Sequence, residues 1–443
     1  MYLINERILF MDSIWSEYTM LPHFHTLKDD IKTDVLIIGG GITGILCAYF
    51  LQEKGIDYIL AEGQTICSGI TKNTTAKITS QHGLIYHKLL KRFGLEKTKL
   101  YLQANQTAVK KYFALCQTID CDFEEKPSYV YSIDNRKKLE KEADALQQIG
   151  FPFKFTEVKE LPFSTVGAIC FEQQAQFHPL KFLAQIAQNL AIYEHTFIKE
   201  LAPNIAVTDQ GNIRYQRLII TTHFPIDNKH GMYFLKMYQH RSYVVALEHA
   251  AKLHGIYVDE ASKGMSFRNY KDLLLVGGGS HRTGKKGGNW QELREFAEKY
   301  YPSSIEKAYW AAQDCMTLDQ VPYIGLYSKN MPQCYVATGF QKWGISSSML
   351  AAMILSDQLA EKENPFASIF RPSRSIVRLQ LLKNSWESIL NLLTPTRKRC
   401  PHLGCALKWN SAEHSWDCPC HGSRFTENGT LLDNPANGDC NLK

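Results

Sequence analysis

Residues 34–62 constrain the fold of this 443-residue chain more than any other stretch. The apolar run 35–38 has the pattern of a buried parallel strand, and it leads directly into a Gly-x-Gly-x-x-Gly turn and an apolar helical segment. A second apolar run, 58–61, follows, with Glu62 at its carboxyl end. Strand, glycine turn, helix, strand and acid in this order predict a dinucleotide-binding βαβ unit, in which the acid accepts hydrogen bonds from the ribose hydroxyls of an adenosine.

The glycines of this turn have separate mechanical tasks. Gly39 allows the tight turn, Gly41 lets a pyrophosphate approach the backbone, and Gly44 brings the helix against the strand. The start of the helix, at Ile42 and Thr43, then supplies backbone N–H groups and a partial positive charge to the phosphates. The alternative interpretation is a glycine-rich turn in some other α/β sheet.

Later segments extend this nucleotide-binding unit. Residues 67–83 are rich in Ser, Thr, Gly and Asn, and such a loop can offer hydroxyls and amides to a diphosphate, although a polar surface loop has the same composition. Residues 217–222 have the pattern of a third buried strand. Residues 334–360 return to strand, glycine turn and helix, and the helix dipole there can stabilise negative charge on a reduced cofactor. Between them, residues 224–288 hold mostly β-type segments, which predicts an inserted antiparallel domain.

Charge and hydropathy favour a cytoplasmic protein. The formal charge of +6 is spread along the chain, so composition gives no support for nucleic-acid binding. No apolar window long enough for a transmembrane segment is present outside the nucleotide-binding unit. The first ten residues include Glu6 and Arg7 and lack a signal-peptide pattern, and seven cysteines are scattered over the first 340 residues, as expected for free thiols.

These segments resemble the glycine oxidase and D-amino-acid oxidase superfamily of FAD-dependent oxidoreductases. The matching motifs are DVLIIGGGITG with Glu62, the SGITKNTTA loop, LLLVGGGSHRTG at 273–284, VPYIG at 321–325 and YVATGFQKWGISSSMLAA at 335–352. The resemblance implies an FAD-binding domain built from several segments, a sheet that covers the flavin, and oxidation of a C–N bond in a small amine or amino-acid substrate by hydride transfer. The expected FAD contacts are Gly39, Gly41, Ile42, Thr43, Gly44, Glu62, Ser68, Thr71, Thr74, Ile198, Thr221, Gly339, Gly344 and Ile345.

The candidates to face the flavin ring are Arg268, His281, Lys342 and Trp343. Arg268 falls about where sarcosine-oxidase-like relatives carry a lysine that helps oxygen react with the flavin, so this arginine argues against a true oxidase. Arg241 can pair with a substrate carboxylate, but a surface or interdomain charge is the preferred interpretation. Cys315 roughly aligns with a cysteine that some relatives attach to the flavin, which makes covalent attachment a hypothesis.

The remaining residues, from 366 onward, begin with an amphipathic segment. Apolar residues recur at three- and four-residue steps between 376 and 393, which predicts a linker helix that ends at Thr394 and Pro395. We expect its apolar face to pack on the main body of the protein and not on a membrane.

Two cysteine-histidine motifs follow the predicted helix. CPHLGC supplies Cys400 and His402, and CPCHGSRF supplies Cys418 and His421, so that two loops offer two thiolates and two imidazoles. Zinc accepts the same ligand set. The full motifs, however, resemble Rieske [2Fe-2S] proteins, in which two cysteines hold one iron and two histidines the other.

Each of these loops has one further cysteine, Cys405 or Cys420. In the cytochrome-bc type of Rieske protein a disulfide joins the loops at these positions, and the resemblance therefore implies this pairing. Rieske domains usually begin with several strands before the first loop, whereas Cys400 here follows the predicted helix almost directly. We therefore expect a short domain without its base sheet, which either docks on the flavoprotein body or holds a weakened cluster.

The overall prediction is an α/β chain with a Rossmann-type FAD-binding domain, an inserted antiparallel-sheet substrate domain and a small Rieske subdomain. The predicted divisions are an N-terminal arm at 1–30, FAD-binding segments at 31–90, 165–225 and 321–365, substrate-domain segments at 91–164 and 226–320, a linker helix at 366–394 and a Rieske domain at 395–443.

The predicted function is an FAD-dependent dehydrogenase or oxidase of an amine or amino acid that passes electrons from reduced FAD to the [2Fe-2S] cluster, and from there to an unknown acceptor. One alternative is a Rieske-type monooxygenase, but His249 and His254 lack the acid and histidine that a mononuclear iron site needs before them, which favours ordinary residues on the surface of a helix. Another is an electron-transfer module or redox sensor without turnover of a small molecule.

Overall fold

The computed structural model describes residues 12–17 and 19–442. The first ten residues, with Glu6 and Arg7, lie outside the described residues. The first sheet has eight strands, and its centre is formed by β2 (Tyr58–Ala61), β1 (Ile31–Ile38), β10 (Asn212–Ile220) and β17 (Met331–Thr338), all parallel. The predicted return of the chain at 217–222 is therefore confirmed, because Ile38 pairs with Ile220.

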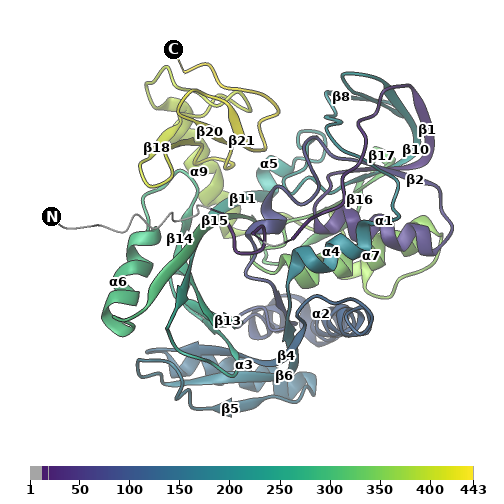
Figure 1. Ribbon diagram of the computed structural model, residues 1–443. Coiled ribbons are helices and arrows are strands. Elements are labelled where there is room, and N and C mark those ends of the chain that lie inside the picture. The colour runs from purple at the N-terminus through teal and green to yellow at the C-terminus, as the bar shows by residue number, and fades with distance from the viewer. Residues whose placement is uncertain (1–11, 18, 443) are drawn as a thin grey trace.

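Helices α1 (Ile42–Glu53) and α7 (Gly344–Leu359) pack against one another on one face of this sheet (Figure 1). Their contact residues are buried and apolar, so burial of this surface stabilises the nucleotide-binding unit. Gly44 is required here: a Cβ atom at this position would lie 1.9 Å from the carbonyl oxygen of Gly39. The task expected of Gly44, close packing of helix on strand, is thus confirmed.

The second sheet has nine strands and lies beside the first (Figure 1). Its order is β15-β11-β14-β13-β12-β4-β6-β3, with β5 beside β6, and all pairs are antiparallel except β12 with β4. The strands are β3 (Lys77–Ile78), β4 (Glu124–Ser132), β5 (Lys154–Thr156), β6 (Gly167–Gln176), β11 (Met237–Glu248), β12 (Ile256–Asp259), β13 (Ser266–Tyr270), β14 (Leu273–Arg282) and β15 (Ile305–Thr317). Strands β3 and β6 thus belong to this sheet, although the predicted boundaries assign their residues to the FAD-binding domain.

The other elements cover these sheets and connect them. The helices are η1 (Ile70–Asn73), α2 (Tyr86–Leu115), α3 (Arg136–Ile149), α4 (Pro179–Ala187), α5 (Tyr233–Lys236), α6 (Trp290–Tyr300), α8 (Ala367–Phe370) and α9 (Leu379–Leu393). The strands are β7 (Ile192–Tyr193), β8 (Glu200–Ala202), β9 (Ile205–Val207) and β16 (Tyr323–Ser328). No described helix is long and apolar enough to cross a bilayer.

The C-terminal subdomain is an antiparallel sheet of four strands, β18 (Lys408–Asn410), β19 (Ser415–Asp417), β20 (Arg424–Thr426) and β21 (Leu431–Asp433). All four follow the first cysteine loop. In the described chain between the end of α9 and Cys400 there is no strand, which agrees with the expected lack of preceding strands. The subdomain lies over β11 and α5 of the main body (Figure 1).

A buried group of ion pairs fastens this subdomain to β11. The Glu413 carboxylate accepts hydrogen bonds from Arg241 Nε at 3.0 Å and Arg424 Nη2 at 2.8 Å, and from the Tyr243 hydroxyl at 2.9 Å. Burial by itself raises the pKa of Glu413, but the guanidinium groups of Arg241 and Arg424 outweigh it and lower the pKa to about 2. The sequence predicted a surface or interdomain charge at Arg241. In the structure Arg241 is an interdomain charge, and its side chain is buried.

The expected packing of the linker helix is wrong. Only Asn384 and Asn391 of α9 are buried, whereas its large apolar side chains are exposed. The polar side of the helix faces the body because Arg282 and Lys285 offer partners there for Asn384 and Glu387.

We expect Glu413→Gln to lower the stability of the docked subdomain by about 3 kcal/mol, because it leaves two buried guanidinium groups with one fewer countercharge. Thermal unfolding and protease release of the C-terminal subdomain measure this effect. Glu427→Gln is the matched control, since Glu427 is 58% exposed and pairs with the exposed His414. Equal stability of the two variants would contradict the assigned role of Glu413.

We also expect the stabilising effect of the Glu413 carboxylate to depend on pH. Since the pKa of Glu413 falls from 4.5 to about 2 on folding, its stabilising effect is complete above pH 4.5 and is lost as the pH falls toward 2. The difference in stability between the unmodified protein and Glu413→Gln should therefore narrow over this window.

Candidate functional site

A cavity of about 760 Å³ extends from the nucleotide-binding turn to the second sheet. Its volume lies within the range of small-molecule and cofactor sites. Of the expected FAD contacts, every residue except Gly44 lines it. Gly44 instead serves the packing of α1 described above. The residues that the sequence predicted to contact FAD therefore lie around one cavity, with Gly44 as the exception.

The glycine turn leaves room for a phosphate group at one end of the cavity. Gly39 has φ +108°, a conformation that favours glycine, and a Cβ atom there would lie 2.9 Å from the carbonyl oxygen of Thr221. The N-cap residue of α1, Gly41, offers no side chain to the helix, and of the first backbone N–H groups that of Ile42 donates a 3.0 Å hydrogen bond to Thr71 Oγ1. Glu62 is held beside the turn, where its carboxylate accepts a 2.6 Å hydrogen bond from the backbone of Gly40. These features fit the pyrophosphate and ribose of FAD.

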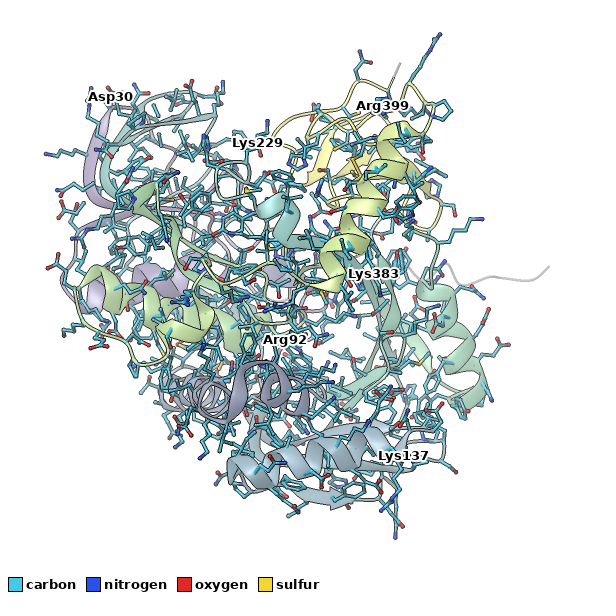
Figure 2. All side chains as sticks on the ribbon, turned by 180° about the vertical axis from the view of Figure 1, so that it is seen from behind. Asp30, Arg92, Lys137, Lys229, Lys383 and Arg399 are labelled. Atoms are coloured by element: carbon cyan, nitrogen blue, oxygen red, sulfur yellow. A yellow bond between two sulfur atoms is a disulfide. The ribbon has the colours of Figure 1, made fainter. Side chains whose placement is uncertain are left out.

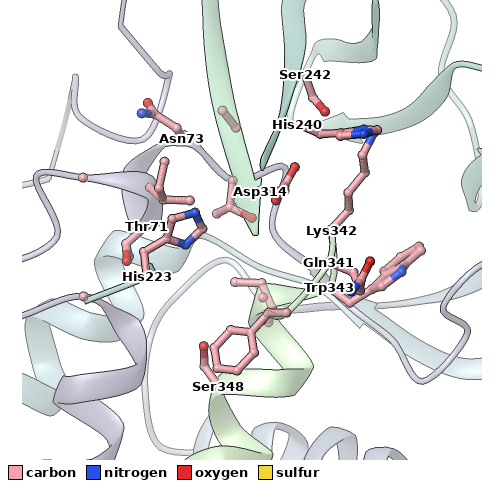
Figure 3. Close-up of a pocket in the computed structure, with 18 of the residues that line it drawn as sticks. Thr71, Asn73, His223, His240, Ser242, Asp314, Gln341, Lys342, Trp343 and Ser348 are labelled. Atoms are coloured by element: carbon pink, nitrogen blue, oxygen red, sulfur yellow. The ribbon is translucent and has the colours of Figure 1, made fainter. Parts of the chain in front are cut away.

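The far end of the cavity contains charged groups from several elements. Lys342 extends toward His240, and Asp314 points into the same space (Figure 3). The Lys342 ammonium donates a 2.6 Å hydrogen bond to Ser280 Oγ. Burial raises the pKa of Asp314 to about 6, while nearby Lys342 opposes the rise. This end of the cavity can therefore hold an ionised ligand and exchange a proton near neutral pH.

Lys77 is a further cation that the sequence motifs did not single out. It lies on β3, lines the cavity, and its Nζ is 3.3 Å from Ser266 Oγ. Burial, followed by the charges of Arg268 and Lys342, lowers its pKa to about 7. Asp314 was missed as well, because its position opposite His240 depends on the pairing of β11 with β15. For Lys77 a signal existed: it directly follows the SGITKNTTA loop.

Two of the candidates to face the flavin ring, Lys342 and Trp343, line the cavity, whereas Arg268 and His281 are not among its lining residues. Arg268 is buried and donates to the carbonyl oxygens of Thr75 at 2.8 Å and Ala76 at 2.6 Å, so it braces the loop before β3. The His281 ring stacks on Tyr243. Trp343 stacks on His82, with ring centroids 5.0 Å apart.

Cys315 does not line the cavity, although its neighbours Asp314 and Met316 do. Its thiol lies 3.7 Å from Gln239 Oε1, on the opposite face of the sheet. This position argues against a covalent bond between Cys315 and a cofactor in the cavity.

His249 and His254 lie in the connection between β11 and β12, and their side chains are 66% and 90% exposed. They are surface residues, as expected, but they are not on a helix. Neither lines the cavity.

Strand β11 lies between the cavity and the second cysteine loop of the C-terminal subdomain. Tyr238 and His240 line the cavity, and Gln239 between them points to the other side, as alternation along a strand requires. Gln239 Nε2 donates 2.9 Å hydrogen bonds to the carbonyl oxygens of His421 and Asn434. Asn434 itself lines the cavity. One strand and a short loop thus lie between the cavity and the second cysteine loop.

The four expected metal ligands, Cys400, His402, Cys418 and His421, are buried together. The two imidazole rings have centroids 5.0 Å apart and are perpendicular. Nε2 of His402 donates to Asn228 Oδ1 at 2.7 Å, while Nδ1 of both histidines is buried without a hydrogen-bond partner. A buried nitrogen without a partner is costly, and a metal ion bound there would satisfy it.

The pKa values of these side chains also favour the binding of a metal ion. Burial lowers the pKa of His402 to about 4 and, together with the nearby His402 and Arg282, that of His421 to about 3, so both imidazoles are neutral at pH 7. A hydrogen bond with Cys418 lowers the pKa of the Cys400 thiol against the effect of burial. The structure joins Cys405 and Cys420 in a disulfide between the two loops. Their sulfur atoms lie within 4.8 Å of the Cys418 sulfur, but the disulfide leaves only Cys418 of these three as a thiolate ligand.

We expect Gly39→Ala to lower the flavin content of the purified protein, because the added Cβ meets the Thr221 carbonyl oxygen beside the cavity. The ratio of absorbance at the flavin band to protein measures it. Gly55→Ala is the matched control: Gly55 also has positive φ, at +66°, but no atom lies within 4 Å of the added Cβ. Equal flavin content in both variants would show that the turn does not hold the cofactor.

We expect His402→Ala to remove the iron-sulfur cluster and leave the flavin in place, since the histidine lies outside the cavity lining. Iron content and the paramagnetic signal of a histidine-ligated cluster measure the loss. His414→Ala is the control within the same subdomain, because His414 is 73% exposed. Retention of the full signal in His402→Ala would refute the ligand assignment.

Similar folds occur among solved protein structures. Glycine oxidase from Geobacillus kaustophilus superposes with a TM-score of 0.66 at 19% identity, over 78% of this chain and 99% of that one. L-proline dehydrogenase from P. horikoshii superposes with a TM-score of 0.67 at 15% identity, over 78% of this chain and 98% of that one. At these identities the likeness concerns the fold.

Sequence comparisons cover both parts of the chain. The family model for FAD dependent oxidoreductases (DAO) matches residues 34–358, and the Rieske [2Fe-2S] domain model matches 381–442. A cytochrome b6-f complex iron-sulfur subunit from Nostoc punctiforme is 51% identical over 37 residues, which are 8% of this chain and 21% of that protein. The putative Rieske 2Fe-2S iron-sulfur protein YhfW of Bacillus subtilis is 33% identical over 96% of both chains. The chain therefore belongs to the DAO family of FAD-dependent oxidoreductases and has a C-terminal Rieske [2Fe-2S] domain.

Proposed function

We propose that this oxidoreductase oxidises a small amine or amino acid in the cavity and passes the electrons through its own Rieske centre. Bound in these two sites, FAD would accept a hydride from the C–H bond beside the substrate nitrogen, and the [2Fe-2S] cluster would transfer single electrons. The observation that carries the proposal is the position of β11, whose Tyr238 and His240 line the cavity while Gln239 holds the second cluster loop.

Further contacts across this strand support a short route between the two sites. The Arg282 guanidinium lies over the Tyr238 ring, 5.0 Å from its centroid, and donates to the carbonyl oxygens of Pro419 and Cys420, both at 2.9 Å. The ion pairs that Arg241 of β11 makes with Glu413 and Asp433 fix the subdomain in this place. Because the docking surface is buried and charged, we propose that electrons pass between the two sites without a hinge motion of the subdomain.

The charged groups at the far end of the cavity are suited to an amino-acid substrate. We propose that Lys77 and Lys342 hold a substrate carboxylate, since two buried cations favour an anion between them. Asp314, with its pKa raised to about 6, accepts a proton from the substrate ammonium. The solved proteins of similar fold include a glycine oxidase, an L-proline dehydrogenase and an L-amino acid deaminase, which agrees with this substrate class.

The domain boundaries and the compartment are part of the same proposal. We retain the FAD-binding, substrate and Rieske divisions of the sequence, apart from β3 and β6, which pair within the second sheet. We place the protein in the cytoplasm, because ten of its twelve cysteines are free thiols in the structure. The acceptor that finally takes the electrons is unknown.

The proposal is tested by mixing the loaded protein with amines and amino acids without oxygen. We expect a substrate to bleach the flavin band and then to produce the paramagnetic signal of the reduced cluster. His402→Ala should still show bleaching but no cluster signal. Gln239→Leu should keep both cofactors and slow the appearance of the cluster signal, because it removes the contact to the His421 loop.

Two results would contradict the proposal. The first is a flavin that is reduced while a fully loaded cluster stays oxidised. The second is a lack of bleaching by every amine and amino acid, together with reduction by a protein donor or NAD(P)H, which would favour an electron-transfer module without turnover.

A further inference from the structure

Helix α9 has its polar and apolar sides arranged opposite to those of an ordinary surface helix. Its polar stripe, which faces the body, consists of Gln380, Asn384, Glu387 and Asn391. Asn384 Oδ1 accepts from Arg282 Nη1 at 2.8 Å, and the Glu387 carboxylate pairs with Lys285 at 2.6 Å. On this side the helix is therefore held in place by polar contacts to Arg282 and Lys285.

The apolar side chains of this segment point outward. Leu379 is 79% exposed, Leu382 67%, Trp386 62% and Leu393 76%. The complete exposed set, which we name the α9 face, is Val377, Leu379, Leu382, Trp386, Ile389, Leu390, Leu392 and Leu393. A contiguous apolar surface of this kind on a protein marks an interaction site.

The charges around the α9 face are almost all positive. Residues 371–399 contain a single acid, Glu387, and seven Arg or Lys residues, of which Arg374 is buried in an ion pair with Asp319 and the other six remain. That acid is neutralised by Lys285. Figure 2 shows α9 at the surface, with Lys383 near one end of the helix and Arg399 beyond the other. The surroundings of the face thus attract a negatively charged partner.

We propose that the α9 face binds the surface of an anionic lipid bilayer, with the helix lying in the plane of the interface. A helix of 15 residues is about 22 Å long, which is too short to cross a bilayer. Leucine, isoleucine and tryptophan on one side with basic residues around them are typical of helices that lie in the interface. Each basic residue near the surface adds attraction to anionic headgroups.

Other occupants of the face fit less well. A second copy of the chain would bring two positively charged surfaces together, which electrostatic repulsion opposes. A protein partner would need an acidic rim around an apolar groove, whereas an anionic bilayer offers both features over any length. The proposal does not depend on the proposed redox function.

The location of α9 gives the membrane contact a consequence for the cluster. The carbonyl oxygen of Asn391 accepts a 3.0 Å hydrogen bond from the backbone of Ala406. Arg399 Nη1 donates to the carbonyl oxygen of Gly404 at 2.8 Å, and its Nη2 donates to that of Thr394 at 3.0 Å. The end of α9 is thus bonded to the first cluster loop, and membrane binding places this loop beside the bilayer.

The test uses the full-length, cofactor-loaded protein and sedimentation with lipid vesicles. We expect binding to vesicles of phosphatidylglycerol and phosphatidylcholine, weaker binding to phosphatidylcholine alone, and a loss of binding to the anionic vesicles as salt is raised. The double variant Leu382→Gln with Trp386→Gln should weaken the partition at least about tenfold, because two large apolar groups no longer enter the interface.

A matched control removes comparable apolar groups elsewhere. Ile133 and Trp409 are 51% and 42% exposed and lie outside the α9 face, so Ile133→Gln with Trp409→Gln should bind vesicles as the unmodified protein does. No binding to anionic vesicles, or equal binding by both double variants, would overturn the proposal. A stable dimer in light scattering that Leu382→Gln with Trp386→Gln disrupts, without vesicle binding, would assign the face to a second copy. Flavin bleaching by a substrate in solution is a separate readout and decides only the redox function.

Discussion

The docking of the Rieske subdomain on strand β11 is the constraint on which the rest of this structure depends. A carboxylate, Glu413, is buried between two guanidinium groups, Arg241 from the body and Arg424 from the subdomain. Glu413 and Arg424 pair within the subdomain, whereas a buried Arg241 without a carboxylate partner would be unfavourable, so the pair between Arg241 and Glu413 requires contact between the two parts. The ion pairs therefore act as a specific connection, and they fix the orientation in which the histidine ligands face the body.

This orientation determines how the two cofactor sites communicate. His402 contacts Asn228, and the backbone of His421 contacts Gln239, so the imidazole side of the cluster is buried against the flavoprotein. An external protein cannot approach these ligands directly in this arrangement. The cavity lies on the side of the histidines, whereas the end of α9 and Pro401 of the first cluster loop are exposed. The direction of electron flow that we propose follows from this asymmetry.

The two ends of the cavity differ in the groups that they offer to a ligand. At one end, glycines and a helix N-terminus offer backbone groups that fit a nucleotide, an arrangement that tolerates little change of side chain. At the other end, Lys77, Asp314 and Lys342 come from three separate elements, and burial moves the pKa of each toward neutrality. Such groups can be exchanged without disturbing the nucleotide site, so one fold can accept different substrates.

The sequence by itself determined the parts that depend on local order along the chain. The glycine turn with Glu62 and the two cysteine-histidine loops are contiguous motifs, and their chemistry requires fixed spacing. The pairing of Cys405 with Cys420 was implied by the Rieske resemblance and is present in the structure. What only the tertiary structure decided depends on contacts between distant segments: the approach of Asp314 to His240, the brace formed by Arg268, the separation of Cys315 from the cavity, and the outward apolar face of α9. Amphipathic periodicity shows that a helix has two faces, but the partners available on the body, here Arg282 and Lys285, decide which face is buried.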